Sequence, residues 1–585
     1  MVQRETPPAV SEKIAGRSAS RLPLRDIYRI VCFKYHPAPR RNKEVVQTLR
    51  QLSGYQQQSE WSLWKAVERA LSDPRAEAFL KVNVCVPVNE QLGEQLRHAL
   101  GLDEVVVIPA LDDPIALSHY LGMAAAQVFG PRLRPGQGLG FSGGRGVGAL
   151  GQTLQLPLDD RRPFRLYALS LLKGHEVLGV TAEGIVEEIV ARHLWGLKGY
   201  LSSPERCPVV GLLDPAGLSP SDLDWAFIGV GALTQGDVIF DYAGAFEFDV
   251  TWARQAGIVA EMLFHPFCAD GLPPRQRPRW LSKVVTVSLA LLRAMVREGK
   301  PVVVVAGGRE KALAVLSVHR AQRAGGPLFN RLVTDEACAK EALHLLGQKD
   351  SEILDKAWQK VCQCFLAVHW RFLANERCRT VKEVARKLSK SRNKASRLLH
   401  EALHGTPPLA KVEVVPPVPE PVFRLDLEAA LLQAFPLREA RVVQPWDGQH
   451  SYQAVGAAAA QLVLEWLKNA SHLRLGLGSG RVRIVVDALG FPQTLQRLTA
   501  LRQLDITVLE SLTWPQTIKV GTRGAAIANS LMVRCLGDRR LRVRLYHEGG
   551  SGFAPFGRRR RGSRWDVSPR RFSTRPLPKP MGYRS

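Results

Sequence analysis

Acidic residues are scarce in this sequence. The 585 residues include 54 Asp and Glu against 80 Lys and Arg, which gives a net charge of +26. Such an excess of positive charge indicates a polyanionic partner, either nucleic acid or an anionic membrane surface. Hydrophobic residues (45%) and charged residues (23%) occur in ordinary globular proportions, so a mostly disordered chain is excluded. At ~100–200 residues per domain, the length predicts three or four folded units.

Cysteine is also sparse, and its spacing argues against a metal centre. Nine Cys are spread along the chain, and the one close pair, Cys362 and Cys364, has a single residue between its members. Metal-binding pairs usually have two to four intervening residues and a second pair or His residues to complete the site. We therefore expect no metal, no disulfide scaffold and mostly buried thiols in a reducing compartment.

Long apolar runs are missing as well. The first 23 residues have no apolar core of the kind that a signal peptide needs. The longest apolar stretch, 284–296, is interrupted by Arg293, and no run reaches 18 residues. We expect a cytoplasmic protein with no membrane partner.

A long internal repeat organises the chain. Four pairs of segments match in the same order, each pair separated by about 330–342 residues. The pairs are 79–88 with 409–418, 121–129 with 455–463, 139–150 with 475–486, and 184–194 with 525–536. Because this spacing exceeds any solenoid period, it indicates duplication of a whole gene-sized unit, with the second copy cut short.

The repeat sets the predicted domain boundaries. We expect two disordered ends, two small helical domains and two larger domains, the last of them truncated. The predicted order is a disordered N-terminus (1–25), a degenerate helix-turn-helix-like domain (26–86), an effector domain (87–347), a helix-turn-helix domain (348–415), a truncated second effector domain (422–548) and a disordered Arg-rich tail (549–585).

Strand-like and helix-like segments alternate between residues 89 and 347. The run VVVV at 302–305 is β-branched throughout, which is typical of a strand buried on both faces. Other predicted strands cover 105–111, 164–172, 209–213 and 225–233, and predicted helices cover 114–129, 183–197 and 310–322. This alternation predicts an α/β fold with a doubly wound, mostly parallel sheet, accompanied by small helical domains.

Residues 379–403 predict two short amphipathic helices joined by a turn. Each helix has one apolar face, formed by Val381, Val384, Ala385 and Leu388 in the first and by Ala395, Leu398, Leu399 and Leu403 in the second. Ser391 is suited to cap the second helix. The pattern predicts a helix-turn-helix whose second helix enters the major groove of DNA.

Polar and basic side chains cluster at the start of that second helix. Arg and Asn can each form two hydrogen bonds with the edge of a base, and Lys suits phosphates. The predicted DNA-binding residues are Lys390, Ser391, Arg392, Asn393, Lys394, Ser396 and Arg397. The alternative is an ordinary solvated pair of basic helices. In the first copy, Trp61 and Trp64 stand where the second has these polar residues, so we expect a decayed unit that packs rather than reads DNA.

These segments resemble the SorC family of bacterial sugar-responsive transcriptional regulators. SRNKASRLLHEA (391–402) looks like the family's recognition helix. The last two strand–helix units of the family resemble 302–316 and 331–343, and 256–271 is similar to a further family segment. The resemblance covers one whole unit, 26–347, and a second, truncated unit, 351–548. It implies a sugar-phosphate-binding domain with a fold similar to ribose-phosphate isomerase and glucosamine-phosphate deaminase.

A glycine-rich loop between a predicted strand and helix is the candidate phosphate site. Such loops bind phosphate through backbone N–H groups and the helix dipole. The resemblance adds a Lys near the ligand phosphate and an acidic hydroxyl acceptor. The candidate effector-binding residues are Ser142, Gly143, Gly144, Arg145, Gly146, Glu261, Lys311 and Glu336. The loop lacks the family's Thr, and Glu183 replaces its Asn, so an altered or lost ligand site is the alternative.

We therefore expect a sugar-phosphate-responsive DNA-binding regulator of carbohydrate metabolism, with DNA and a phosphorylated sugar as partners. We expect no enzyme activity and no cofactor, since no Asp/His pair has the spacing that isomerases or deaminases use. Two alternatives remain: a sugar-binding protein that does not bind DNA, or an enzyme of the isomerase or deaminase type. A truncated second sheet would expose a strand edge, so we also expect a homo-oligomer or an intrachain contact that covers it.

Overall fold

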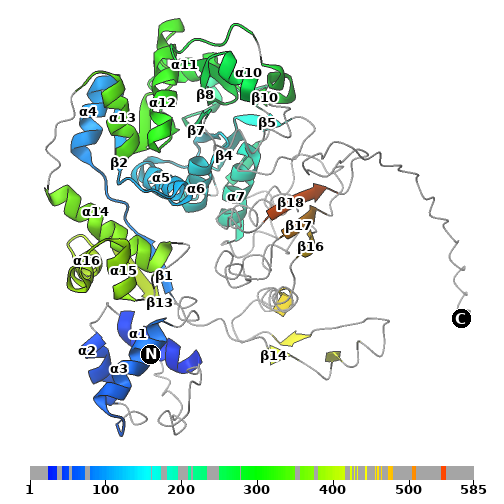
Figure 1. Ribbon diagram of the computed structural model, residues 1–585. Helices are drawn as coiled ribbons and strands as arrows, with labels where there is room; N and C mark the ends of the chain where they lie inside the picture. Colours follow the sequence, from blue (N-terminus) through cyan, green and yellow to red (C-terminus); the bar gives the residue numbers. More distant parts are fainter. Residues whose placement is uncertain are drawn as a thin grey trace, which may run out of the picture. The chain divides into compact units, whose positions relative to one another are not determined.

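The computed structural model describes two helical regions, most of an α/β domain and short segments of the last third of the chain (Figure 1). The described residues are 24–35, 42–51, 56–72, 80–159, 161–172, 181–195, 209–212, 215–233, 250–276, 278–348, 356–374, 378, 380–414, 422–423, 427–428, 431, 442–444, 455, 458–459, 463, 472–477, 503–508 and 542–547. The predicted disordered tail lies outside them, as does the predicted N-terminal segment except its last two residues, Leu24 and Arg25, which belong to a helix. None of the helices in these stretches is long and apolar enough to cross a membrane.

A parallel sheet forms the centre of the α/β domain. Its strands lie in the order β2 (Glu104–Ile108), β12 (Arg331–Asp335), β11 (Val302–Val305), β7 (Trp225–Ala232), β3 (Gly138–Phe141), β4 (Phe164–Ala168) and β6 (Val209–Leu212). Every neighbouring pair in this order is parallel. An antiparallel extension, β8 (Ile258–Met262) and β9 (His265–Cys268), pairs with the end of β7. The predicted mostly parallel sheet is confirmed.

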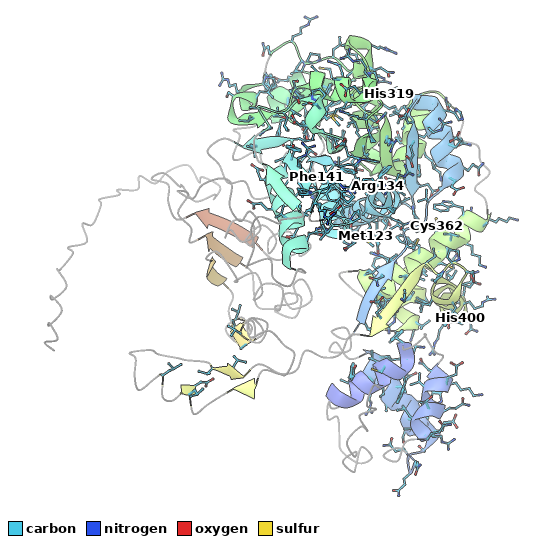
Figure 2. The ribbon with its side chains drawn as sticks, turned by 180° about the vertical axis from the view of Figure 1, so that it is seen from behind. Met123, Arg134, Phe141, His319, Cys362 and His400 are labelled. Atoms are coloured by element: carbon cyan, nitrogen blue, oxygen red, sulfur yellow. The ribbon has the colours of Figure 1, made fainter. Side chains whose placement is uncertain are left out.

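Helices cover both faces of this sheet, as a doubly wound fold requires (Figure 1). The helices are α4 (Glu90–Leu100), α11 (Leu289–Arg297), α12 (Ala312–Arg320) and α13 (Glu336–Leu345) on one face, and α5 (Pro114–Phe129), α6 (Arg145–Thr153) and α7 (Ala182–Trp195) on the other. In β11, Val302 and Val304 join the first core while Val303 and Val305 join the second. Phe141 of β3, labelled in Figure 2, belongs to the second core. Its ring stacks on that of Phe227 of β7.

Local sequence signals account for several element boundaries. Helix α5 covers the predicted residues 114–129, because Asp113 accepts a hydrogen bond from the backbone N–H of Ile115 and Pro114 occupies the first turn. Gly122 lets α5 approach α6 closely, since a Cβ there would lie 2.3 Å from the backbone nitrogen of Leu150.

The predicted strand 164–172 is two strands, which corrects the sequence-based boundary. The chain leaves the parallel sheet at Leu169, whose carbonyl accepts from the N–H of Val287. The following residues form β5 (Ser170–Leu172), which pairs with the antiparallel strand β10 (Val284–Thr286). The strand is divided because β5 pairs with β10, which lies more than 100 residues further along the chain.

The helical regions have the same order of elements. The first contains α1 (Leu24–Tyr35), α2 (Asn42–Arg50), α3 (Glu60–Ser72) and then β1 (Leu80–Val84). The second contains α14 (Lys356–Val368), which continues into the π-helical turn η8 (His369–Leu373), then α15 (Val381–Lys387), α16 (Arg392–His404) and β13 (Ala410–Val414). Their buried side chains form one shared core. Strands β1 and β13 pair antiparallel, with Val82 opposite Val412.

A small parallel sheet is described in the last third of the chain. It contains β16 (His472–Leu477), β17 (Gln503–Val508) and β18 (Arg542–His547), in that order. A short antiparallel pair, β14 (Val422–Phe423) and β15 (Val443–Gln444), precedes it. Strands β16, β17 and β18 pair parallel in this order, as β3, β4 and β6 do in the large sheet. The first set comes after the predicted repeat segment 455–463, and the second set comes after its match, 121–129. The remainder of the predicted segment 422–548 lies largely outside the described residues.

Candidate functional site

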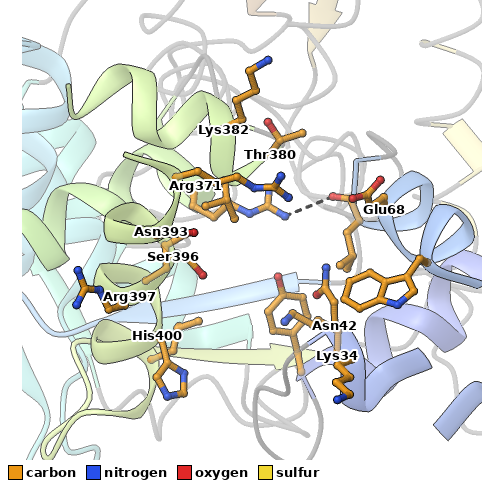
Figure 3. Close-up of a pocket in the computed structure, with 18 of the residues that line it drawn as sticks. Lys34, Asn42, Glu68, Arg371, Thr380, Lys382, Asn393, Ser396, Arg397 and His400 are labelled. Atoms are coloured by element: carbon orange, nitrogen blue, oxygen red, sulfur yellow. Dashed lines mark hydrogen bonds between the residues drawn. The ribbon is translucent and has the colours of Figure 1, made fainter. Parts of the chain in front are cut away.

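A cationic groove lies between the two helical regions (Figure 3). Helices α1, α2 and α3 line one side, and η8, α15 and α16 line the other. Its volume is about 1190 Å³. Eight Lys or Arg side chains line it, and Glu68 is the one acidic residue among its lining residues. A groove with this charge attracts a polyanion.

Helices α15 and α16 are fixed at a tight turn by side-chain caps. Thr380 and Glu383 form a capping box at the start of α15. Ser389 adopts a left-handed backbone conformation, with φ of 51°, which reverses the chain between the helices. The Ser391 hydroxyl oxygen then accepts a hydrogen bond from the backbone N–H of Lys394 at 3.2 Å. The predicted apolar faces pack together, and Val384, Ala385, Ala395, Leu398 and Leu399 are buried.

The structure brings four of the seven predicted DNA-binding residues together along the groove. Arg392, Asn393, Ser396 and Arg397 line it from α16, and all four are exposed. Figure 3 labels the last three. Lys390, Ser391 and Lys394 are not among the lining residues, and the Ser391 oxygen is engaged in its helix cap. The four lining side chains offer hydrogen-bond donors and acceptors as well as charge, which is what base edges require.

Helix α3 contributes the opposite wall of the groove, and two tryptophans belong to this wall. Trp61 is 70% exposed, and the Lys65 Nζ lies 5.6 Å from the centre of its ring. Trp64 is half-buried and lines the groove. Trp61 therefore points outward, because the inward positions of α3 are taken by Leu63, Ala66 and Val67.

Six of the groove's eight cations were missed by the sequence analysis, and two of these six link the helical regions. They are Lys34, in the last turn of α1, and Arg371, in η8. Burial, with a further contribution from the nearby Arg371 guanidinium, lowers the pKa of Lys34 to about 8. Arg371 donates hydrogen bonds to the backbone carbonyls of Cys378 and Leu71, so it links the second helical region to the end of α3. A match between CFKY (32–35) and HWRF (369–372), 337 residues apart like the predicted repeat matches, is the signal that could have found them.

A second candidate site lies in the α/β domain, where the ends of β3 and β7 meet. The connection after β3 leads to β4 on one side, and the connection after β7 leads to β11 on the other. Such a switch point leaves a crevice at the carboxyl ends of the strands, the usual position of ligands in doubly wound sheets. The predicted glycine-rich loop follows β3 at this point.

The loop 142–146 is held close to β7 by a buried serine. The Ser142 Oγ accepts a hydrogen bond from the N–H of Gly229 and donates one to the carbonyl of Gly143, each at 2.8 Å. Gly144 has a φ of 118°, which favours glycine, and it precedes the first turn of α6. A Cβ on Gly146 would lie 2.9 Å from a methyl group of Val305. The sequence thus directs the N-terminus of α6, which begins with Arg145, toward the switch point.

Lys311 and Glu261 lie beside the same strand, β7. The Lys311 Nζ donates a hydrogen bond to the carbonyl of Val230 at 2.8 Å. Glu261 of β8 is paired with Gly231 of β7. The Glu261 Oε2 accepts a hydrogen bond from the backbone N–H of Phe264 at 2.8 Å. The predicted cation and acid are thus placed near the end of β7, as a phosphate-and-hydroxyl site needs.

Glu336 is directed elsewhere. Its carboxylate forms an ion pair with Lys340 and accepts a hydrogen bond from the Trp358 Nε1 of α14. Asp335, the preceding residue, accepts from the N–H of Gly308 at 2.6 Å, and burial raises the pKa of Asp335. Glu336 therefore ties α13 to α14. Glu183 lies in the first turn of α7.

Within the second helical region, helix α14 and the turn η8 are the part that contacts helix α5 of the α/β domain. The Tyr120 hydroxyl of α5 lies 3.0 Å from the Nδ1 of His369, and the rings of Tyr120 and Phe365 contact each other edge to face. His369 is buried, and this burial lowers its pKa to about 4, although Asp113 opposes the shift. Cys362 lies on the same helix α14, while His400 lies on α16 beside the groove (Figure 2). The contacts of Tyr120 thus join α5 to α14 and η8.

Comparisons with known proteins bear on the α/β domain. Residues 218–344 match the family model Sugar-bind, whose description reads "Putative sugar-binding domain". Solved structures similar to this chain include the full-length sorbitol operon regulator SorC of Klebsiella pneumoniae. The two share 18% identity with a TM-score of 0.33, and the match covers 55% of this chain and 99% of that one. A transcriptional regulator of Streptococcus pneumoniae shares 18% identity over 44% of this chain and 98% of its own, with a TM-score of 0.33.

A DeoR family transcriptional regulator of Listeria monocytogenes is similar at 17% identity over 43% of this chain and 99% of its own, also with a TM-score of 0.33. No curated protein sequence matches this chain. The α/β domain thus contains a sugar-binding domain match, and the structural neighbours are transcriptional regulators of the SorC and DeoR type.

Proposed function

We propose that this chain is a DNA-binding transcriptional regulator that responds to a sugar phosphate. Helix α16 is its recognition helix, and the crevice at the ends of β3 and β7 is its effector site. The observation that carries the proposal is the capped, outward-facing start of α16, where Arg392, Asn393, Ser396 and Arg397 line a groove rich in cations. Donors and acceptors on a rigid helix suit base edges, while the surrounding charge suits phosphates.

The effector half of the proposal depends on the loop 142–146 and Lys311. The backbone N–H groups at the start of α6 suit a phosphate dianion, and Lys311 supplies a positive charge beside β7. The family match over residues 218–344 includes Lys311 and Glu261 and supports a sugar as the ligand class. We leave Glu336 out of the effector site, because its carboxylate is engaged by Lys340 and Trp358.

Replacing Arg392 should test base recognition directly. Arg392→Ala is expected to cost ~1–3 kcal/mol of binding free energy on a selected DNA site if Arg392 reads a base. Lys390→Ala is expected to weaken binding to all sequences alike and to reduce the salt dependence by about one phosphate contact. Fluorescence anisotropy on duplexes selected by the full chain from a random pool, measured at several salt concentrations, gives both quantities.

The control for these variants is Arg161→Ala, since Arg161 is an exposed arginine in the α/β domain away from the groove. It should bind the selected duplex as the unchanged protein does. Equal affinities for the unchanged protein and the Arg392 and Lys390 variants would contradict the assignment of α16 as the recognition helix.

A further inference from the structure

We infer that the two helical regions of one chain form an intramolecular pseudo-dimer that binds two unlike DNA half-sites, with α16 on one and α3 on the other. The inference rests on the proposed function, since it assumes that α16 reads DNA. It adds that α3 is a second helix that reads DNA. It also adds that one chain binds one duplex and that the two half-sites of this duplex differ in sequence.

The pairing of β1 with β13 has the register of a two-fold axis. The repeat match of 79–88 with 409–418 makes Val82 the counterpart of Val412, and Lys81 that of Lys411. In the structure Val82 lies opposite Val412, and Lys81 lies opposite Glu413. Counterpart residues therefore meet at the centre, and the strands diverge symmetrically from it. An antiparallel pair of unrelated strands would have no reason to centre on counterparts.

A second contact also joins two counterpart residues. CFKY (32–35) corresponds to HWRF (369–372), which makes Tyr35 the counterpart of Phe372. The centroids of these two rings lie 6.1 Å apart, edge to face. The neighbouring counterparts, Lys34 and Arg371, are close enough for Arg371 to disfavour the charge on Lys34.

Helices α3 and α16 have the same pattern of burial. Both contain 13 residues, and their counterparts are 332 residues apart. The buried positions coincide: Leu63, Ala66, Val67 and Ala70 in α3 match Ala395, Leu398, Leu399 and Ala402 in α16. The outward positions coincide as well, so α3 presents to the groove the face that α16 presents.

The groove is lined by counterparts from both sides (Figure 3). Lys65 faces it from α3 as its counterpart Arg397 does from α16, and Trp61 corresponds to Asn393. The charge is cationic on both sides, which suits the phosphates of one continuous duplex. The remaining side chains differ, with Trp61 and Glu68 on α3 where α16 has Asn393 and His400. Unlike outward residues select unlike bases, so the two half-sites differ in sequence.

The test compares two charge reversals at counterpart positions in the full chain. Duplexes are first selected from a random 30-bp pool with the unchanged protein. Arg397→Glu and Lys65→Glu are then each expected to lower the affinity for the selected duplex about tenfold or more, since each replaces a cation of the groove with an anion that the phosphates repel. Native mass spectrometry should find one chain per duplex, and footprinting should find two half-sites of different sequence about 10 bp apart.

The outcomes separate the two proposals. Arg161→Glu is the matched control, because it changes the net charge equally at an exposed position away from the groove. Loss of affinity in Arg397→Glu with full affinity in Lys65→Glu would keep α16 as the reader and overturn the pseudo-dimer. A palindromic site bound by two chains would overturn it too. Full affinity in both variants, or no selected duplex, would overturn the proposed function itself. Circular dichroism must match the unchanged protein, and Lys65→Gln gives a milder variant if Lys65→Glu does not fold.

Discussion

Addition of its sugar phosphate should raise the apparent free energy of unfolding of the unchanged protein by ~2.7 kcal/mol at a hundredfold excess over Kd. The expected site is the loop 142–146 with Lys311, so Lys311→Ala should abolish the gain. Without ligand the substitution should cost at most ~1 kcal/mol, because it removes one half-buried hydrogen bond, to the Val230 carbonyl. A thermal-shift screen of fructose, glucose and ribose phosphates measures both effects.

Arg309→Ala is the matched control for this screen. Arg309 lies on the same turn as Lys311, but its guanidinium is exposed and pairs with Glu341 of α13. The control should retain the full stabilisation by the ligand. A stabilising sugar phosphate whose effect survives in Lys311→Ala would place the ligand elsewhere in the protein. No stabilisation by any of these compounds at millimolar concentration would mean that the domain keeps the fold without the effector site.

Acidification should destabilise the junction between α5 and η8. His369 is buried beside Tyr120, and burial lowers the pKa of His369 from 6.5 to about 4. The folded state therefore keeps this imidazole neutral while the unfolded state takes up a proton below pH 6.5. The neutral imidazole therefore contributes fully to the free energy of unfolding at neutral pH. This contribution is lost as the pH falls from 6.5 toward 4, so the free energy of unfolding should drop by about 2 kcal/mol between pH 7.5 and pH 5.

A non-titrating variant isolates this contribution from other groups that titrate in acid. His369→Gln keeps a hydrogen-bonding side chain near Tyr120, and its free energy of unfolding should fall less than that of the unchanged protein over the same pH range. Thermal unfolding measured from pH 7.5 to pH 5 gives the difference. His344→Gln is the control, since His344 is exposed on α13 and lies outside this junction. Equal pH dependence in the unchanged protein and His369→Gln would contradict this account of the junction.

The sequence predicted best where the signals are local. Asp113, Pro114 and the apolar run after them define α5, and the capping residues Thr380 and Ser391 define the helices on either side of Ser389. The parallel sheet followed from the alternation of strands and helices, which the right-handed crossover rule translates directly into topology.

The sequence predicted least where one segment depends on a distant one. The break at Leu169 depends on Val287, and the exposure of Trp61 depends on which face of α3 the shared core occupies. The groove depends on Lys34 and Arg371, which come from helices that precede the predicted DNA-binding residues. The carboxylate of Glu336 is engaged because Trp358 of the connecting helix reaches it. Each of these is a tertiary contact that a single segment does not encode.

The most direct test of the central claim is the affinity of the full chain for its selected duplex, measured with and without the sugar phosphate that stabilises it. Coupling between an effector site and a DNA site is typically worth about 1–3 kcal/mol, so the account predicts a change of roughly fivefold or more in Kd. The change should vanish in Lys311→Ala. An affinity for DNA that the bound sugar phosphate leaves unchanged would contradict a sugar-phosphate-responsive regulator.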